Sequence, residues 1–128
     1  MSIEAAPREA VQFGRAAEAF ILLILAEGRS YGYQIRQRLQ EEFDYQRAAD
    51  AGALYRLLRD LEAAGLIASE WDIAETGPAR RYYQLTPEGH TQLQLTADRL
   101  TRQAKRIERF FEVYETIKTQ PATAGSQQ

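Results

Sequence analysis

The chain has 128 residues, of which 45% are hydrophobic and 27% are charged, and its formal net charge at pH 7 is −2. This length predicts one domain with a core of its own, and the composition is typical of a globular protein. The absence of cysteine excludes disulfides and thiolate metal sites. The longest apolar run, Phe20–Ala26, is too short to span a membrane, and the mixed-charge N-terminus does not resemble a secretory signal. We expect a cytoplasmic protein with no membrane partner.

The first half of the chain predicts three helices. Residues 1–14 have weak periodicity and are expected to form a flexible arm or a short extra helix. A helix over Ala16–Glu27 is followed by Gly28, which is typical of a helix end. A second helix is expected over Gly32–Phe43, with Ser30 as its cap and an apolar stripe of Ile35, Leu39 and Phe43. After a turn over residues 44–49, a third helix is expected over Ala51–Ala64, between the cap Asp50 and Gly65.

The second half predicts a hairpin and one long helix. Two antiparallel strands are expected over Leu66–Ile73 and Arg80–Leu85, joined by a turn that contains Gly77 and Pro78. Thr86 followed by Pro87 indicates the start of a last helix, Pro87–Lys118. Residues 119–128 have the composition of a disordered tail. The fold class is thus mostly α with a small β-hairpin wing: a winged helix-turn-helix over residues 15–86, then a C-terminal dimerisation helix over 87–118.

The outward face of the third helix is the first candidate for DNA binding. Leu54, Leu57, Leu58 and Leu61 lie on one side at helical spacing and predict a core stripe. The opposite side carries Gly52, Tyr55, Arg56, Arg59 and Ala63. Arginine can donate two hydrogen bonds to a guanine edge or to a phosphate, and a glycine in the first turn lets a phosphate approach the helix N-terminus. A solvated helix face is the alternative, but the wing that follows favours groove contact.

The wing and the second helix supply further candidates. Arg80 and Arg81 follow the turn and point to opposite faces of their strand, so one can contact DNA while the other meets the sheet edge or an acidic neighbour. Tyr83 with Leu85, and Ile67 with Trp71 and Ile73, are expected to cover the core, whereas Tyr82 is assigned to neither role. Tyr31 and Tyr33 open the second helix, where a phenol can contact a phosphate, with packing beneath the wing as an equal alternative.

The last helix predicts a second chain as partner. Its apolar residues recur with heptad spacing, typical of a coiled-coil seam. The seam consists of Leu93, Ala97, Leu100, Ala104, Ile107, Phe111 and Tyr114. A helix of roughly 30 residues would extend about 45 Å, more than one small domain needs to cover its core. A helix folded back on its own domain is the less favoured alternative.

Nothing in the sequence indicates an enzyme, a cofactor or a metal site. His90 is the only histidine, and no phosphate-binding loop, paired-carboxylate motif or metal-ligand spacing is present. The carboxylates Glu41, Glu42 and Asp44 are better explained by a solvated helix end.

Residues 16–89 resemble the PadR family of bacterial transcriptional regulators. The resemblance is carried by Tyr31-Gly32-Tyr33-Gln34-Ile35, Gly52-Ala53-Leu54-Tyr55, Leu61-Glu62, Gly65-Leu66-Ile67, Glu70-Trp71, Gly77-Pro78, Arg80-Arg81-Tyr82-Tyr83 and Leu85-Thr86. It implies a regulator of transcription, most often a repressor, that dimerises through its terminal helices. The expected partners are therefore double-stranded DNA, at a palindromic site, and a second copy of the chain.

The chain departs from the family pattern at three points. Arg56 stands where relatives commonly have proline, and Ala53 stands where a serine or threonine is frequent. The single tryptophan, Trp71, is in the wing instead of at the dimer interface, which argues against a multidrug sensor. The one-helix C-terminal region resembles the compact members of the family, which include a cyanobacterial circadian regulator.

Two alternatives come from the same residues. The acidic net charge would suit a protein-interaction module on a winged-helix scaffold, since a fold does not decide function. A small aromatic effector could bind near Phe110, Phe111 and Tyr114, although interface packing explains these rings better.

Overall fold

The computed structural model describes residues 8–45, 50–73 and 77–120, with side chains from Ala16 onward. Along the chain the elements are α1 (Arg8–Glu27), β1 (Ser30–Tyr31), α2 (Gly32–Glu41), α3 (Ala51–Ala63), β2 (Ile67–Asp72), β3 (Arg80–Leu85) and α4 (Pro87–Lys118). They form two compact units, Met1–Gln94 and Leu95–Gln128. The predicted fold class, mostly helical with a β-hairpin wing and a long C-terminal helix, is confirmed.

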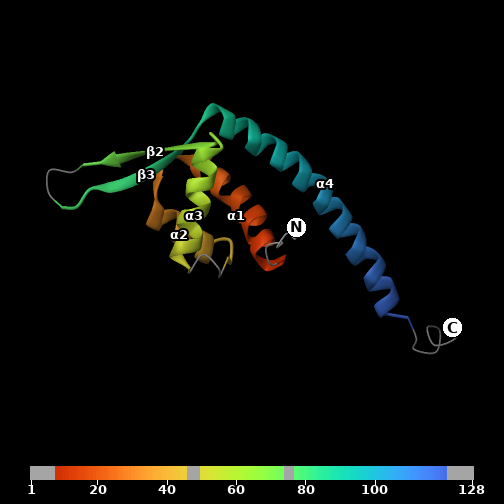
Figure 1. Ribbon diagram of the computed structural model, residues 1–128. Helices are drawn as coiled ribbons and strands as arrows, with labels where there is room; N and C mark the ends of the chain where they lie inside the picture. Colours follow the sequence, from red (N-terminus) through yellow and green to blue (C-terminus); the bar gives the residue numbers. More distant parts are fainter. Residues whose placement is uncertain (1–7, 46–49, 74–76, 121–128) are drawn as a thin grey trace, which may run out of the picture. The chain divides into compact units, whose positions relative to one another are not determined.

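Three antiparallel strands form the sheet, in the order β1-β3-β2. The hairpin pairs Ile67 with Leu85 at its base and Asp72 with Arg80 near its tip. On the other edge of β3, Tyr31 lies opposite Tyr82. The strand β1 was not predicted, because two residues are too few to show the alternation that identifies a strand. In Figure 1 the β2–β3 hairpin extends well past α1, α2 and α3, which gather at its base.

The core of the first unit lies between these three helices and one face of the sheet. The largest fully buried side chains come from all three helices and from β2 and are Ile21, Leu22, Ile24, Ile35, Leu39, Leu54, Leu58 and Ile67. Tyr83 of β3 is buried with them, and Leu57 is partly buried against the cluster. The leucine stripe predicted for the third helix is therefore confirmed.

Local capping explains where α3 and α4 begin. The Asp50 carboxylate accepts a hydrogen bond from the Ala53 N–H at 3.2 Å, and Gly65 ends α3 with φ +81°, a backbone conformation that glycine adopts readily. Thr86 Oγ1 accepts from the Gly89 N–H at 3.0 Å and donates to the Gly65 carbonyl at 2.6 Å. Thr86 thus joins the start of α4 to the end of α3, in agreement with the predicted cap.

The second helix begins and ends differently from the prediction. Its N-cap is Tyr31 instead of Ser30, because Ser30 pairs with Tyr83 in the sheet. The Gln34 side chain accepts a hydrogen bond from the Tyr31 N–H at 2.9 Å and completes the first turn. The helix ends at Glu41, and Phe43 packs beyond it, 4.2 Å from Phe20 between ring centroids.

Two expectations were wrong, one about where the first helix begins and one about which wing side chains are buried. Helix α1 begins at Arg8, because the run from Arg8 to Ala17 contains strong helix formers and a single tolerated glycine. Trp71 and Ile73 do not cover the core: they are 58% and 78% exposed. Strand alternation places them on the same face as buried Ile67, but the hairpin has passed the helices before it reaches them.

The second unit is the C-terminal part of α4. Its large apolar side chains are exposed within the single chain: Leu95, Leu100, Ile107, Phe110, Phe111, Val113, Tyr114 and Ile117. None of the helices in the described ranges is long and apolar enough to cross a membrane.

Candidate nucleic-acid interface

The outward face of α3 carries two exposed arginines. Arg56 and Arg59 lie on the side of the helix opposite buried Leu54, Leu58 and Leu61. Gly52 is also exposed: a Cβ atom built there would lie 3.4 Å from Asp50 Oδ1 and 3.5 Å from Arg56 Nη1. The Arg56 guanidinium therefore folds back toward the first turn of α3. It brings positive charge to a helix N-terminus that Asp50 has capped with negative charge.

Tyr55 has a structural contact that the sequence did not reveal. A Cβ atom at buried Gly32 would lie 2.6 Å from the Tyr55 hydroxyl oxygen and 2.7 Å from its Cε1 atom. The Tyr55 ring thus rests against the backbone at the start of α2 while its side chain stays 39% exposed. This ring ties α3 to α2 at a position where only glycine leaves room for it.

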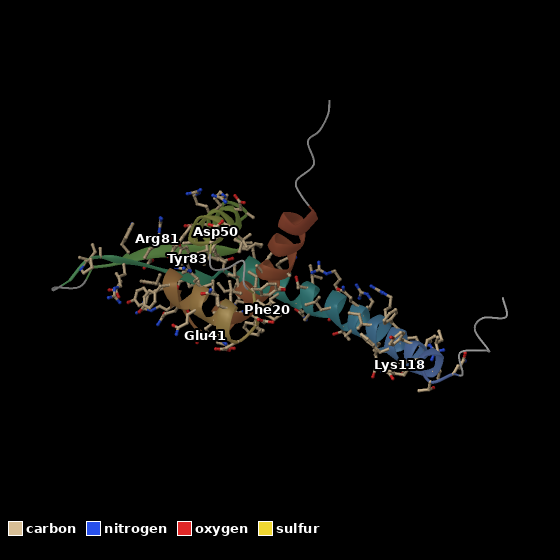
Figure 2. The ribbon with its side chains drawn as sticks, turned by 90° about the horizontal axis from the view of Figure 1, so that it is seen from below. Phe20, Glu41, Asp50, Arg81, Tyr83 and Lys118 are labelled. Carbon is tan, nitrogen blue, oxygen red and sulfur yellow. The ribbon has the colours of Figure 1, made fainter. Side chains whose placement is uncertain are left out.

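The two wing arginines point to opposite faces of the sheet, as strand alternation predicted. The Arg81 guanidinium lies 5.3 Å from the centre of the Trp71 ring, on the core-side face of the hairpin. In Figure 2 the Arg81 side chain points to the side of the sheet on which α3 and its cap Asp50 lie. Arg80 lies on the other face, near the rings of Tyr31 and Tyr33.

The phenol of Tyr83 connects the wing with α3 electrostatically. Burial raises the pKa of Tyr83, and the positive charges of Arg81 and Arg59 oppose that rise. Both guanidinium groups therefore lie within electrostatic range of the Tyr83 hydroxyl. All three arginines on this side are exposed, and we call them the arginine surface: Arg56 and Arg59 of α3, and Arg81 of the wing.

On the opposite face of the wing, three tyrosines and two arginines form the tyrosine cluster: Tyr31, Tyr33, Tyr82, Arg29 and Arg80. The Tyr31 and Tyr33 rings are stacked, with centroids 5.9 Å apart and planes 8° apart. Arg80 lies 5.9 Å from the first ring and 5.6 Å from the second, and its Nη1 donates to the Tyr33 hydroxyl at 3.4 Å. Arg29 lies 4.2 Å from the centre of the Tyr82 ring and was not among the predicted residues.

Two wing carboxylates hold this cluster in place. The Tyr31 hydroxyl donates to Asp72 Oδ2, and the Tyr82 hydroxyl donates to Glu70 Oε1 at 2.6 Å. Each hydrogen bond raises the pKa of its phenol, because the protonated form is the donor. Glu70 and Asp72, the acidic neighbours on the wing, therefore accept hydrogen bonds from tyrosines. Tyr33, half exposed, remains accessible to a phosphate.

A third cluster explains the carboxylates at the end of α2. Arg38 forms ion pairs with Glu42 at 2.8 Å and with Glu27 at 3.0 Å. These hydrogen bonds raise the pKa of Arg38, and the guanidinium lowers the pKa of Glu42. In the described part of the chain, no group of three or more His, Cys, Asp or Glu side chains is arranged to hold a metal ion. Glu41, Glu42 and Asp44 are all exposed, as expected for a solvated helix end.

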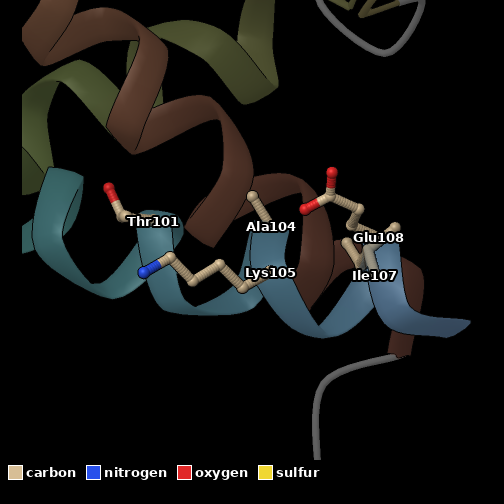
Figure 3. A pocket seen from close by; sticks show the side chains of 5 residues that line it. All are labelled: Thr101, Ala104, Lys105, Ile107 and Glu108. Atoms are coloured by element: carbon tan, nitrogen blue, oxygen red, sulfur yellow. The ribbon is translucent and has the colours of Figure 1, made fainter.

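The seven seam residues predicted on α4 fall into two sets. Leu93 is partly buried and packs against the core of the first unit, because it belongs to the first two turns of α4. The other six are exposed: Ala97, Leu100, Ala104, Ile107, Phe111 and Tyr114. Phe110 stacks on Tyr114, with ring centroids 6.2 Å apart. A depression in this unit is lined by five side chains of the same helix: Thr101, Ala104, Lys105, Ile107 and Glu108 (Figure 3).

Comparisons with known proteins agree on one family. The sequence model of the transcriptional regulator PadR-like family matches residues 21–95. None of the curated proteins matches the chain. A PadR family transcription regulator from Clostridium difficile is 27% identical, and the match covers 74% of this chain and 97% of that one with a TM-score of 0.67.

Two further solved structures are similar along most of their length. A transcriptional regulator from Clostridium thermocellum is 28% identical, with 78% of this chain and 97% of that chain covered and a TM-score of 0.67. A conserved protein described as a potential transcriptional factor is 29% identical, with 91% and 100% covered and a TM-score of 0.71. These descriptions mention no circadian role, so the expected similarity to a circadian regulator has no support. The family match spans more than half of the sequence, and the chain therefore belongs to the PadR-like family of transcriptional regulators.

Proposed function

We propose that this regulator is a repressor that binds a palindromic operator in double-stranded DNA as a homodimer. The arginine surface carries the proposal: Arg56 and Arg59 on the outward face of α3, and Arg81 on the side of the wing where α3 lies. A helix of this kind fits the major groove, where an arginine fork reads a guanine edge, and a wing arginine reaches a neighbouring phosphate. Tyr33 at the start of α2 and Gly52 at the start of α3 would add contacts to phosphates of the DNA backbone.

Dimerisation is supported by the apolar residues of α4. Leu100, Ile107 and Phe111 are 40%, 49% and 53% exposed in the single chain. They recur with the spacing of a coiled-coil seam, and a second copy would remove them from water. A twofold dimer presents two identical recognition helices, so its operator should be palindromic. A regulator of this kind acts on DNA, and we place it in the cytoplasm.

The proposal does not extend to a small-molecule effector. The depression shown in Figure 3 is lined by side chains of one helix, and binding sites for small molecules are more enclosed than this. Repression is the role that occupation of an operator most simply produces, because a bound dimer blocks access to the DNA.

Base reading by α3 can be tested with alanine variants. Duplexes that bind the protein are first selected from a random pool, and the preferred sequence is compared with a scrambled duplex of equal length. We expect Arg56→Ala and Arg59→Ala to weaken binding to the preferred duplex by about 1–3 kcal/mol and to leave binding to the scrambled one nearly unchanged. Lys118→Ala, which removes a positive charge at the far end of α4, is the matched control.

Equal losses on both duplexes would assign these arginines to phosphates instead of bases. If no duplex is enriched and the wild-type protein binds DNA only at low salt without preference, the proposal is wrong. The winged helix would then be a scaffold for protein interaction.

A further inference from the structure

Five positive side chains lie together on α4, outside the winged helix. They are Arg99, Arg102, Lys105, Arg106 and Arg109, and we call them the basic stripe. All five are exposed. The unit that contains them, Leu95–Gln128, has six basic and four acidic residues and hence a net charge of +2, whereas the whole chain has −2. Net charge therefore conceals a local positive surface on this helix.

Helical geometry separates the basic stripe from the dimer seam. At about 100° per residue, the five side chains fall within an arc of about 120°, and the arc of Leu100, Ile107 and Phe111 is centred on the opposite side of the helix. Dimerisation through the seam would thus leave the stripe exposed. Asp98 shares the arc, yet it lies beside the first cation and does not interrupt the run. In Figure 2 several side chains with nitrogen tips project from one side of the middle of α4.

The stripe is poorly neutralised by its own helix. Of its five cations only Arg109 forms an ion pair within the described residues, with Glu112 at 3.2 Å. The Lys105 side chain points toward Thr101 and away from Glu108 (Figure 3). Arg102 has one acidic neighbour, Asp98, four residues before it, and three positive neighbours: Arg99 three residues before it, and Lys105 and Arg106 three and four residues after it. At these spacings the three like charges outweigh the single opposite one and destabilise the free helix. An arrangement that weakens the free helix is explained if an anionic partner binds it.

We propose that the basic stripe binds the phosphate backbone of duplex DNA beside the operator, an inference that rests on the proposed function. Four of the five residues are arginines, whose planar guanidinium can donate two hydrogen bonds to one phosphate. The stripe is about 15 Å long, and duplex DNA carries one negative charge per about 1.7 Å of its axis, so it can face several phosphates. DNA flanking the operator is present whenever the winged helix is bound, and it supplies a regular row of charges.

The experiment compares a duplex that ends at the operator with one extended by about ten base pairs, one helical turn, on each side. The test variant is Arg99→Gln/Arg102→Gln/Arg106→Gln, and the matched control replaces the same three residues by lysine. We expect the glutamine variant to bind the short duplex like the wild type. On the long duplex its affinity and salt dependence should fall to the values measured on the short one. The negative slope of log K against log salt should become shallower by about 0.9 for each lost phosphate contact. The lysine variant should retain most of that slope.

Free protein supplies a second measurement. Because glutamine removes like-charge neighbours and has good helix propensity, we expect the thermal midpoint of the glutamine variant to equal or exceed that of the wild type. If sedimentation shows that this variant no longer assembles like the wild type, Lys105→Gln/Arg109→Gln replaces it with the same expectations.

Wild-type affinity and salt slope on the long duplex would overturn the inference while leaving the proposed function intact. The inference would also be overturned if the glutamine variant kept the wild-type salt slope on DNA but bound polyglutamate more weakly. That result would assign the stripe to an acidic protein. If instead the wild-type protein has no sequence preference on the short duplex, the proposed function itself fails, and the two failures are thereby distinguished.

Discussion

At the scale of single residues, Gly32 shows how one missing side chain positions the recognition helix. The Tyr55 ring occupies the space that a Cβ atom at Gly32 would need. Tyr55 was predicted as a DNA contact from its outward position, and that role remains a prediction. Its packing against Gly32 could not be foreseen, since helical periodicity places a residue on a face without saying which neighbouring backbone meets it.

This contact makes Gly32→Ala a test of the α2–α3 packing. The added methyl would force the Tyr55 ring to move, and overpacking of this kind typically costs about 1–3 kcal/mol. In Tyr55→Ala the same methyl has room, so Gly32→Ala should cost much less in that background. Urea unfolding of the wild type, the two single variants and the double variant gives the coupling free energy between the two residues. Additive effects would show that the two residues do not meet.

The hydrogen bond from Tyr31 to Asp72 makes the stability of the folded protein depend on pH in the alkaline range. The pKa of Tyr31 is raised above its ordinary value of 10.0, chiefly by this hydrogen bond and then by burial. The bond therefore stabilises the folded state fully below the unfolded pKa, and its contribution is lost as pH rises through the higher folded pKa.

We expect the stability difference between the wild type and Tyr31→Phe to shrink as pH rises from neutral to about pH 11. Urea midpoints of both proteins measure it, and Tyr33→Phe, which lacks a carboxylate contact among the described residues, is the control. A difference that stays constant across this range would mean that the phenol does not donate to Asp72.

At the scale of elements, the two faces of the wing separate its two arginines. Arg81 lies on the face it shares with Tyr83, whose phenol is also within electrostatic range of Arg59, whereas Arg80 rests on Tyr31 and Tyr33. We therefore expect Arg81→Ala to reduce the magnitude of the slope of log K against log salt by about 0.9 per lost phosphate contact. In a dimer the reduction should be twice as large. Arg80→Ala should leave the slope nearly unchanged. The opposite result would assign the DNA contact to the tyrosine face.

Trp71 gives this experiment an internal reporter. It is the only tryptophan, it is 58% exposed, and it lies under the Arg81 guanidinium. DNA binding at this face should change its fluorescence in the wild type and change it less in Arg81→Ala.

Elements with strong local signals were predictable from the sequence, and those without them were not. Asp50, Gly65 and Thr86 fixed the ends of α3 and the start of α4 because capping chemistry is local. The two-residue strand β1 was missed, because it exists only through its pairing with β3. The wrong cap, Ser30, has the same cause: its backbone is used by the sheet.

The candidate site was predictable in its residue types but not in its grouping. Alternation correctly separated Arg80 from Arg81, yet no local pattern shows that Arg81 and Arg59 act on the same phenol or that Arg29 covers Tyr82. Alternation also placed Trp71 and Ile73 on the core-side face without indicating where the core ends. That limit is set by the length of the hairpin relative to the helices, a property of the tertiary structure.

At the scale of the whole molecule, the acidic net charge is compatible with DNA binding because opposite charges are segregated. Carboxylates at the ends of α1 and α2 are paired with Arg38, and Glu70 and Asp72 accept hydrogen bonds from tyrosines. The arginine surface and the basic stripe keep most of their positive charge free of ion pairs within the described residues. Local fields of this kind, and not net charge, govern encounter with a polyanion.

The mass of the protein–DNA complex decides whether a dimer of this chain binds one operator. Sedimentation equilibrium of the wild type with its selected duplex should give two 14.6 kDa chains per duplex. Leu100→Glu/Ile107→Glu should sediment as a monomer and lose most of its affinity, because a carboxylate cannot be buried against an apolar seam without a large cost. Leu23→Glu, at an apolar residue of α1 that is 39% exposed and belongs to neither the seam nor the arginine surface, controls for added negative charge. A wild-type protein that stays monomeric at high concentration and binds the duplex as one chain would contradict the account.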